Sequence, residues 1–138
     1  MKGRDFLDTN VLLYAYSPLD RRKQKIADGL VRRAVSGESV ISAQVLGEFA
    51  SVMLHKILPT KTPDEVMRLL DTLAPIKIVV PETEMVRRAV EAHAAYGIHS
   101  YDGMIVAAAE REGSEKIWSD DLNAGQKYFG VTVANPFQ

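Results

Sequence analysis

The 138-residue sequence contains no cysteine. This absence excludes disulfide frameworks, thiolate nucleophiles, zinc ribbons and iron–sulfur clusters, and it fits the reducing cytoplasm in which we expect the protein. No apolar run approaches the roughly 20 residues that a membrane span requires. The N-terminus reaches acidic residues before any apolar stretch begins, so we expect neither a membrane anchor nor a signal peptide.

An excess of either charge is also lacking, because 17 Lys and Arg residues stand against 18 Asp and Glu residues, for a net charge of −1. A protein that coats duplex DNA by its overall charge is therefore not expected, although a local basic patch can still steer a nucleic acid. The proportions of hydrophobic residues (46%) and charged residues (25%) are ordinary for a globular protein. At this length they predict a single domain over residues 1–138.

Short β-branched runs alternate with longer helical stretches along the chain. This alternation predicts an α/β fold, with a parallel central sheet of about four to five short strands and helices on both of its faces. The expected strands are Phe6–Leu7, Ser39–Ile41, Ile76–Val80, Lys116–Trp118 and Val131–Val133. The expected helices run over about Thr9–Tyr16, Arg21–Val35, Ala43–Ile57, Pro63–Leu73 and Thr83–Tyr96, with a last helix that Ser100 caps and Gly113 ends.

Acidic side chains follow the ends of several predicted strands, which is where the chemistry of open parallel sheets is found. Asp8 ends the first strand, and Asp120 and Asp121 follow the fourth. Glu48 lies beside the apolar stripe of its helix, where a carboxylate is unusual. Asp102 lies in the first turn of a helix that is otherwise apolar almost all round.

Carboxylates at positions 8, 48, 102 and 121 would repel one another if they converged without a cation. Oxygen ligands of high charge, with no nitrogen or sulfur, suit Mg²⁺ or Mn²⁺ rather than zinc. The pattern therefore predicts an acidic pocket that holds a hard cation, as in enzymes that hydrolyse phosphodiesters. Each acid also has a structural alternative as a helix cap, an exposed side chain, a first-turn acid or a turn residue.

The sequence resembles the PIN domain ribonucleases, and in particular the toxin component (VapC type) of prokaryotic toxin–antitoxin pairs. Four segments carry the resemblance in the family's order and spacing: Phe6–Leu12 (FLDTNVL), Ile41–Phe49 (ISAQVLGEF), Ser100–Ala109 (SYDGMIVAAA) and Trp118–Leu122 (WSDDL). The ending Asn135–Pro136–Phe137 is similar to one branch of the family. The resemblance thus covers nearly the whole chain.

The resemblance implies a metal-dependent endoribonuclease. The acids implied to hold one or two Mg²⁺ or Mn²⁺ ions are Asp8, Glu48, Asp102 and Asp121. The residues implied to support and orient them are Thr9, Asn10, Ser119 and Asp120. Either Asp120 or Asp121 can be the direct ligand, and the family spacing of Ser or Thr, any residue, then Asp favours Asp121.

The family further implies a 5′-phosphate product and a structured RNA substrate such as tRNA or rRNA. It implies a homodimer or higher homo-oligomer, and a small cognate antitoxin whose tail fills the acidic groove. The sequence departs from the family pattern in small ways, since Gly103 stands where alanine is common and Asp120 where glutamate is common.

Two other functions stay open. A phosphatase of the haloacid dehalogenase type also begins with an Asp at the end of its first strand, but it needs a second Asp where this chain has Asn10. A catalytically weak PIN-like module would only bind RNA or scaffold a complex, although four acids held together without metal argue against it.

Basic and aromatic residues outside the acidic set are open to two interpretations. The basic cluster Arg21, Arg22, Lys23 and Lys25 is either a solvated helix face or a contact for RNA phosphates. The tyrosines near the expected cleft, Tyr14, Tyr16 and Tyr101, either pack in the core or stack on a base, and core packing is favoured.

Overall fold

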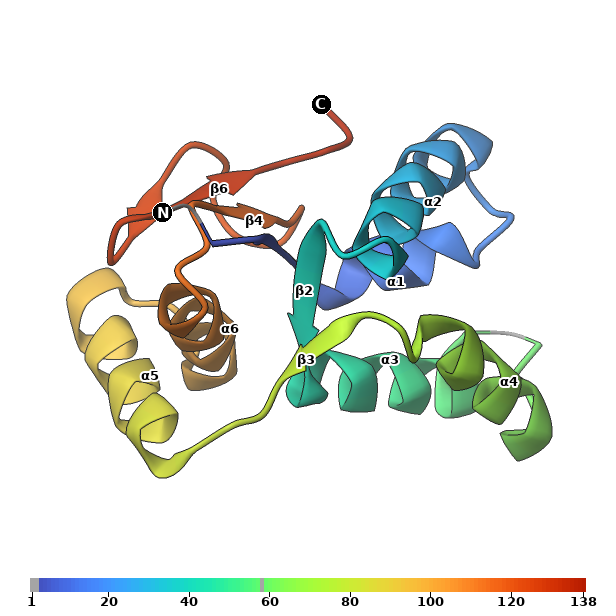
Figure 1. Ribbon diagram of the computed structural model, residues 1–138, viewed down its shortest axis with the longest axis horizontal. Coiled ribbons are helices and arrows are strands. Elements are labelled where there is room, and N and C mark those ends of the chain that lie inside the picture. Colours follow the sequence, from blue (N-terminus) through green and yellow to red (C-terminus); the bar gives the residue numbers. More distant parts are fainter. Residues whose placement is uncertain (1–2, 58) are drawn as a thin grey trace.

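One sheet organises the computed structural model, which describes residues 3–57 and 59–138 (Figure 1). Its strands within these residues are β1 (Asp5–Leu7), β2 (Ser39–Ser42), β3 (Lys77–Val79), β4 (Lys116–Trp118), β5 (Lys127–Tyr128) and β6 (Val131–Ala134). The order across the sheet is β3-β2-β1-β4-β6-β5. Neighbouring strands pair in parallel, except that β5 and β6 are antiparallel. The predicted α/β fold with a parallel sheet is confirmed.

Helices fill the connections between the first four strands. They are α1 (Thr9–Ala15), α2 (Arg21–Val35), α3 (Ala43–His55), α4 (Pro63–Leu73), α5 (Thr83–Tyr96) and α6 (Ser100–Arg111). The chain moves in one direction across the sheet from β1 to β3, and then returns to the other side of β1 at β4. Because crossovers between parallel strands are right-handed, this reversal places α5 and α6 on the face opposite to α1–α4, as Figure 1 shows.

Most boundaries follow from local signals in the sequence. The side chain of Thr62 accepts a hydrogen bond from the N–H of Glu65, and the carboxylate of Glu65 accepts one from the N–H of Thr62, which is the expected capping box of α4. Gly97 ends α5 in the left-handed region, at φ 73°. The cap predicted for α6 at Ser100 is wrong, because His99 occupies that position and its Nδ1 accepts the Tyr101 N–H.

The core lies between the sheet and the helices on its two faces. Phe6, Leu7, Ile41 and Ile117 of the central strands are completely buried, and each contributes roughly 1.5–3 kcal/mol through removal from water. The residues of α6 from position 105 to position 109 are all buried, as its apolar composition predicts. In the part of the chain that the structure describes, no helix has the length and apolar character to span a bilayer.

The reversal of chain direction falls between β1 and β4. In open parallel sheets, the crevice at the carboxyl ends of two such strands is the usual place for a ligand. Asp8 follows β1 directly and its N–H donates to the carbonyl of Trp118, the last residue of β4, at 3.0 Å. The fold therefore places Asp8 and the loop that begins at Ser119 side by side at this crevice.

Candidate metal centre

Asp8 is the most deeply placed acid of the predicted set, with only 6% of its surface exposed. It caps α1, because its Oδ1 accepts the N–H of Thr9 at 2.7 Å, and its Oδ2 accepts the hydroxyl of Ser119 at 2.7 Å. Burial raises the pKa of Asp8 to about 6, against the opposing effect of these two hydrogen bonds. The carboxylates of Asp121 and Asp102 add to the rise.

Ser119 connects the two strands that flank the crevice. Its side chain is completely buried, and its Oγ donates to Asp8 while accepting the N–H groups of Asp121 (3.1 Å) and Leu122 (3.2 Å). A hydroxyl has one proton and two lone pairs, so these three bonds use its full capacity. The loop after β4 is therefore held at a fixed position relative to Asp8.

Glu48 projects from the second turn of α3 and is exposed. Its Oε2 accepts the Thr9 hydroxyl at 3.2 Å, and its Oε1 accepts Nε2 of Gln44 at 2.8 Å. The same nitrogen of Gln44 donates to the carbonyl of Tyr101 at 3.0 Å, which joins α3 to the start of α6. Sequence analysis missed this role of Gln44, although the spacing of four residues to Glu48 is a visible signal.

Asp102 lies half-buried in the first turn of α6. Burial raises its pKa, a rise that His99 opposes and the carboxylate of Glu48 reinforces. An acid at this position also interacts favourably with the positive end of the helix dipole. Asp102 is thus coupled electrostatically to an acid of α3.

Asp120 and Asp121 share one partner from α1. Nδ2 of Asn10 donates to Oδ1 of Asp120 and to Oδ2 of Asp121, at 3.0 Å in both cases. Burial raises the pKa of Asp121, followed in size by the effects of Asp120, Asp102 and Glu48. Asp121 is therefore coupled electrostatically to the carboxylates of two other elements, and its choice over Asp120 as the ligand stays a prediction.

These acids form a loose set rather than a closed cage. Residues 3–57 and 59–138 contain no group of three or more His, Cys, Asp or Glu side chains close enough together to hold one metal ion. The chemistry of the predicted donors nevertheless fits a hard cation, because all four are carboxylates. Mg²⁺ usually keeps several waters and is held by one or two carboxylates, so three side chains in one coordination sphere are not required.

A comparison with family models decides the classification. The model described as PIN domain matches residues 6–129. The chain belongs to the PIN domain family. PIN domains are nucleases, so the family confirms the resemblance carried by the four segments and contradicts the phosphatase alternative. Asn10 agrees with this outcome, because its amide donates to two carboxylates and has no acidic proton to give.

Solved structures with the same fold cover nearly the whole chain, whereas no curated protein matches it. The structure of FitAB bound to an IR36 DNA fragment has a TM-score of 0.71 and 20% identity, over 97% of this chain and 96% of that one. A toxin–antitoxin complex from Klebsiella pneumoniae has a TM-score of 0.69 and 19% identity, over 96% and 97%. DNA-bound VapBC from Salmonella typhimurium has a TM-score of 0.69 and 16% identity, over 99% of each chain.

The basic cluster divides into two pairs in this PIN domain. Nη2 of Arg22 donates to the carbonyl of Phe137 at 2.7 Å, and Nζ of Lys23 lies 5.6 Å from the centre of the Phe137 ring. These two residues therefore bind the C-terminal segment. Arg21 and Lys25 are exposed and line a hollow of about 400 Å³ on α2.

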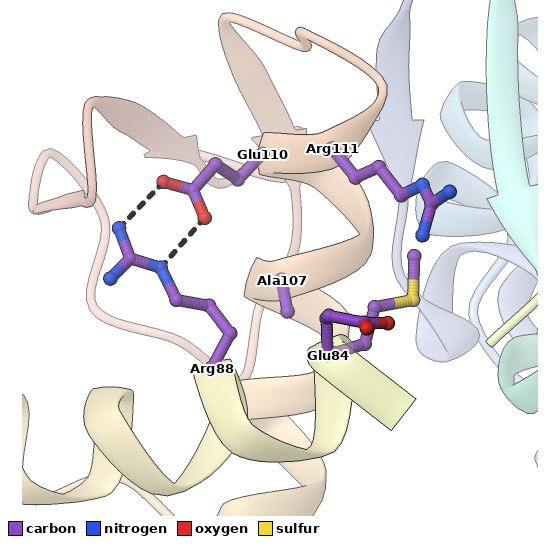
Figure 2. A pocket seen from close by; sticks show the side chains of 6 residues that line it. Glu84, Arg88, Ala107, Glu110 and Arg111 are labelled. Atoms are coloured by element: carbon purple, nitrogen blue, oxygen red, sulfur yellow. Dashed lines mark hydrogen bonds and ion pairs between the residues drawn. The ribbon is translucent and has the colours of Figure 1, made fainter. Parts of the chain in front are cut away.

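A separate hollow of about 280 Å³ lies between α5 and α6, and none of the acids predicted for the site lines it (Figure 2). Nε and Nη2 of Arg88 each donate to one carboxylate oxygen of Glu110 at 2.8 Å. Arg111 forms an ion pair with Glu82 at 2.7 Å. Because glutamates neutralise both arginines, we assign this hollow to the packing of α5 on α6.

Proposed function

We propose that this PIN domain is a Mg²⁺- or Mn²⁺-dependent endoribonuclease. In this proposal Asp8 and Asp102 hold the ion directly, and Glu48 and Asp121 hold it directly or through water, with one or two ions in all. The observation that carries the proposal is a set of hydrogen bonds that links these acids. Ser119 bonds both Asp8 and the loop of Asp121, Thr9 bonds both Asp8 and Glu48, and Gln44 joins Glu48 to the residue before Asp102. Their electrostatic coupling supports it, because each of Asp8, Asp102 and Asp121 has its pKa raised in part by another carboxylate.

An anionic RNA backbone would add further negative charge to this set of acids. The repulsion makes binding of a phosphodiester unfavourable unless a cation lies between the two. When bound, a divalent cation supplies a Lewis acid that activates water near neutral pH and neutralises charge on the phosphate. The role of the acids is therefore to hold that charge at one place beside the scissile bond.

Hydrogen bonds from the chain hold the acids in position. Ser119 and the N–H of Thr9 each occupy one lone pair on a different oxygen of Asp8, which leaves a lone pair on each oxygen. Gln44 and the hydroxyl of Thr9 do the same for Glu48. Such an arrangement orients the carboxylates without neutralising them, as a metal site requires.

The same proposal extends to the biological role. A structural neighbour is described as a toxin–antitoxin complex and another as VapBC, and each likeness spans at least 96% of this chain. Together with the VapC-type motifs, this supports a toxin that cleaves RNA, such as tRNA or rRNA, in the cytoplasm. A small cognate antitoxin would inhibit it, and it would form a homodimer or a higher homo-oligomer.

A catalytically weak module that binds RNA or scaffolds a complex is the second candidate. The observation in its favour is that the described residues hold no group of three potential ligands close enough to bind one ion. The two functions differ in what they require of Asp8 and Asp102, since a binding module does not depend on a metal-assisted reaction.

The decisive substitutions are Asp8→Asn and Asp102→Asn, which preserve shape and remove one charge each. We expect both variants to lose RNA cleavage and growth inhibition together, because the ion is held by so few carboxylates. In EDTA both should melt at or above the wild-type temperature, since each change relieves repulsion in the crevice. Wild-type protein should gain about 2.7 kcal/mol in Mn²⁺ at a hundredfold excess over Kd, and the variants should gain less.

Asp20 provides a matched control, because it caps α2 through a hydrogen bond from the Lys23 N–H (3.0 Å). The Asp20→Ala variant should lose about 1 kcal/mol of stability and keep cleavage and the response to Mn²⁺. If either Asn variant cleaves RNA at nearly the wild-type rate in Mg²⁺, the assignment of the acids is wrong. The binding module then becomes the better function.

A further inference from the structure

The three tyrosines near the crevice have different surroundings. The ring of Tyr14 packs edge-on against Phe137, with centroids 4.8 Å apart, and the ring of Tyr16 lies 5.8 Å from that of Phe49. Tyr101 differs from both, because 66% of its surface is exposed. A large aromatic ring left in water is informative, since folding gains little from it there.

The backbone of Tyr101 is fixed next to the candidate metal centre. Its N–H donates to Nδ1 of His99 at 3.1 Å, and its carbonyl accepts Nε2 of Gln44 at 3.0 Å. That nitrogen of Gln44 also holds Glu48, and Asp102 is the next residue along α6. The backbone that carries the exposed ring is therefore held by hydrogen bonds close to Asp102 and Glu48.

A second ring lies beside that of Tyr101. The centroid of the His99 ring is 5.4 Å from it, and the two planes are inclined by 37°. His99 also lines a shallow hollow of about 210 Å³ with Val90, His93 and Ser100. The contact restricts the Tyr101 side chain in advance, which lowers the entropy that any partner would have to remove.

We propose that Tyr101, supported by His99, stacks on an unpaired nucleobase next to the phosphodiester bound at the acids. The inference rests on the proposed nuclease function and assigns to Tyr101 the contact with one base of the substrate. Base faces stack on exposed aromatic rings in proteins that bind single strands. In a duplex those faces are covered by the neighbouring base pairs, so the ring selects against paired RNA.

The immediate surroundings favour a nucleic acid over a protein as the occupant. The ring lies beside His99, and Gln44 and Glu48 are held at the Tyr101 carbonyl. The hollow next to His99 is lined by two histidines and a serine, with Val90 as its apolar residue. A protein contact would more often bury an aromatic ring among other apolar groups. One exposed ring beside the proposed phosphodiester site is the arrangement that stacking requires.

The test measures binding of an unstructured 12-nucleotide RNA of mixed sequence to the full chain in Ca²⁺, by fluorescence anisotropy. The comparison ligand is an abasic chain of the same length. We expect Tyr101→Ala to weaken RNA binding roughly 5- to 100-fold, and Tyr101→Phe to restore it. The abasic chain should bind wild-type protein and the Tyr101→Ala variant equally, and the surface control Leu19→Ala should bind RNA like wild type.

A spectroscopic signal tests the contact directly. In the Tyr101→Trp variant, RNA should quench the new tryptophan emission and the abasic chain should not, relative to wild-type protein with Trp118 alone. If wild-type protein binds RNA and the abasic chain equally and Tyr101→Ala changes neither, stacking is wrong and the nuclease function stands. If Tyr101→Ala instead changes the oligomeric state without changing RNA binding, the ring is a protein contact. If wild-type protein binds neither ligand, stacking at Tyr101 is wrong, and the nuclease function is decided separately by the cleavage assays of Asp8→Asn and Asp102→Asn in Mg²⁺.

Discussion

Ser119 shows how much of the candidate site depends on a single side chain. Its hydroxyl donates to Asp8 and accepts two N–H groups from the loop that carries Asp121. Alanine would leave these groups without partners in a completely buried place, and threonine would need space for a methyl group there. The orientation of Asp8 and the position of Asp121 therefore depend on the same atom.

Asp8 predicts an unusual pH dependence of stability in the metal-free protein. Its pKa is about 6 in the folded state, against 3.8 without the protein environment. The native state therefore binds this proton more tightly than the unfolded state does, and unfolding free energy falls as pH rises from about 4 to about 6. The loss should approach about 3 kcal/mol and then stay constant. Urea denaturation in EDTA across this pH range measures it.

The Asp8→Asn variant supplies the control for this titration, because it cannot ionise. Its stability should lack the fall between pH 4 and pH 6 and exceed that of wild type at pH 7. The gain in unfolding free energy should be smaller than the loss that ionisation of Asp8 causes in wild type, since an amide nitrogen cannot accept the hydrogen bond of the Ser119 hydroxyl. If the unfolding free energy of the wild-type protein in EDTA rises over this pH range, the pKa of the buried Asp8 carboxyl is not raised.

At the scale of secondary structure, the contact between α5 and α6 sets the place of Asp102. Gly103 lets the two backbones approach closely, because a Cβ built there would lie 2.6 Å from the carbonyl oxygen of Ala89 and 2.9 Å from its Cα. At the other end of α6, the paired hydrogen bonds between Arg88 and Glu110 join the same two helices (Figure 2). The first turn of α6 is therefore fixed from the side of α5.

Gly103→Ala tests this close approach. The methyl group has no space, so the helices must separate, and we expect a loss of about 1–3 kcal/mol in stability. Mn²⁺ affinity should fall as well, because Asp102 is the adjacent residue. The control is Gly29→Ala in α2, where a Cβ meets nothing within 4 Å and alanine should add roughly 0.5–1 kcal/mol. Denaturation and Mn²⁺ titration measure both effects, and equal stabilities of the two variants would contradict the packing argument.

The elements that the sequence predicts are those with strong local signals. All five predicted strands are present, with ends within one residue of the predicted ones, and Thr62 and Gly97 marked helix ends. β5 was missed because a two-residue strand shows no periodicity and exists only through its pairing with β6. The cap of α6 was misplaced by one residue because histidine is an uncommon cap, whereas serine is a preferred one.

Some of the residues that hydrogen-bond to the acids could be predicted from the sequence, and others could not. Thr9, Asn10 and Ser119 follow strand ends in recognisable motifs, and the structure shows each of them donating to a carboxylate. The link from Gln44 to the carbonyl of Tyr101 joins residues 57 positions apart. Such a contact depends on how α3 and α6 pack, which no local pattern contains.

The whole molecule has almost no net charge, so any attraction for RNA must come from how the charges are distributed. The acids proposed to hold the ion would repel a phosphate backbone in the absence of a cation. On α2, Arg22 and Lys23 are engaged by the C-terminal segment at Phe137. Arg21 and Lys25 are exposed and line the hollow on α2, so they are the members of the predicted cluster that we expect to meet a phosphate.

Replacing Arg21 and Lys25 together by alanine should therefore weaken RNA binding and make it less sensitive to salt. Each phosphate contact that is lost should reduce the slope of log K against log salt concentration by about 0.7 for single-stranded RNA. Anisotropy titrations from 50 to 300 mM salt measure that slope, and melting in Mn²⁺ should stay at the wild-type temperature because the acids are untouched.

The Arg87→Ala, Lys127→Ala double variant is the control, because it removes the same charge from exposed positions on α5 and β5. If both double variants shift the slope equally, RNA responds only to the net charge. If neither shifts it, the exposed face of α2 has no phosphate contact. A change confined to the α2 variant would place the path of the RNA over this helix.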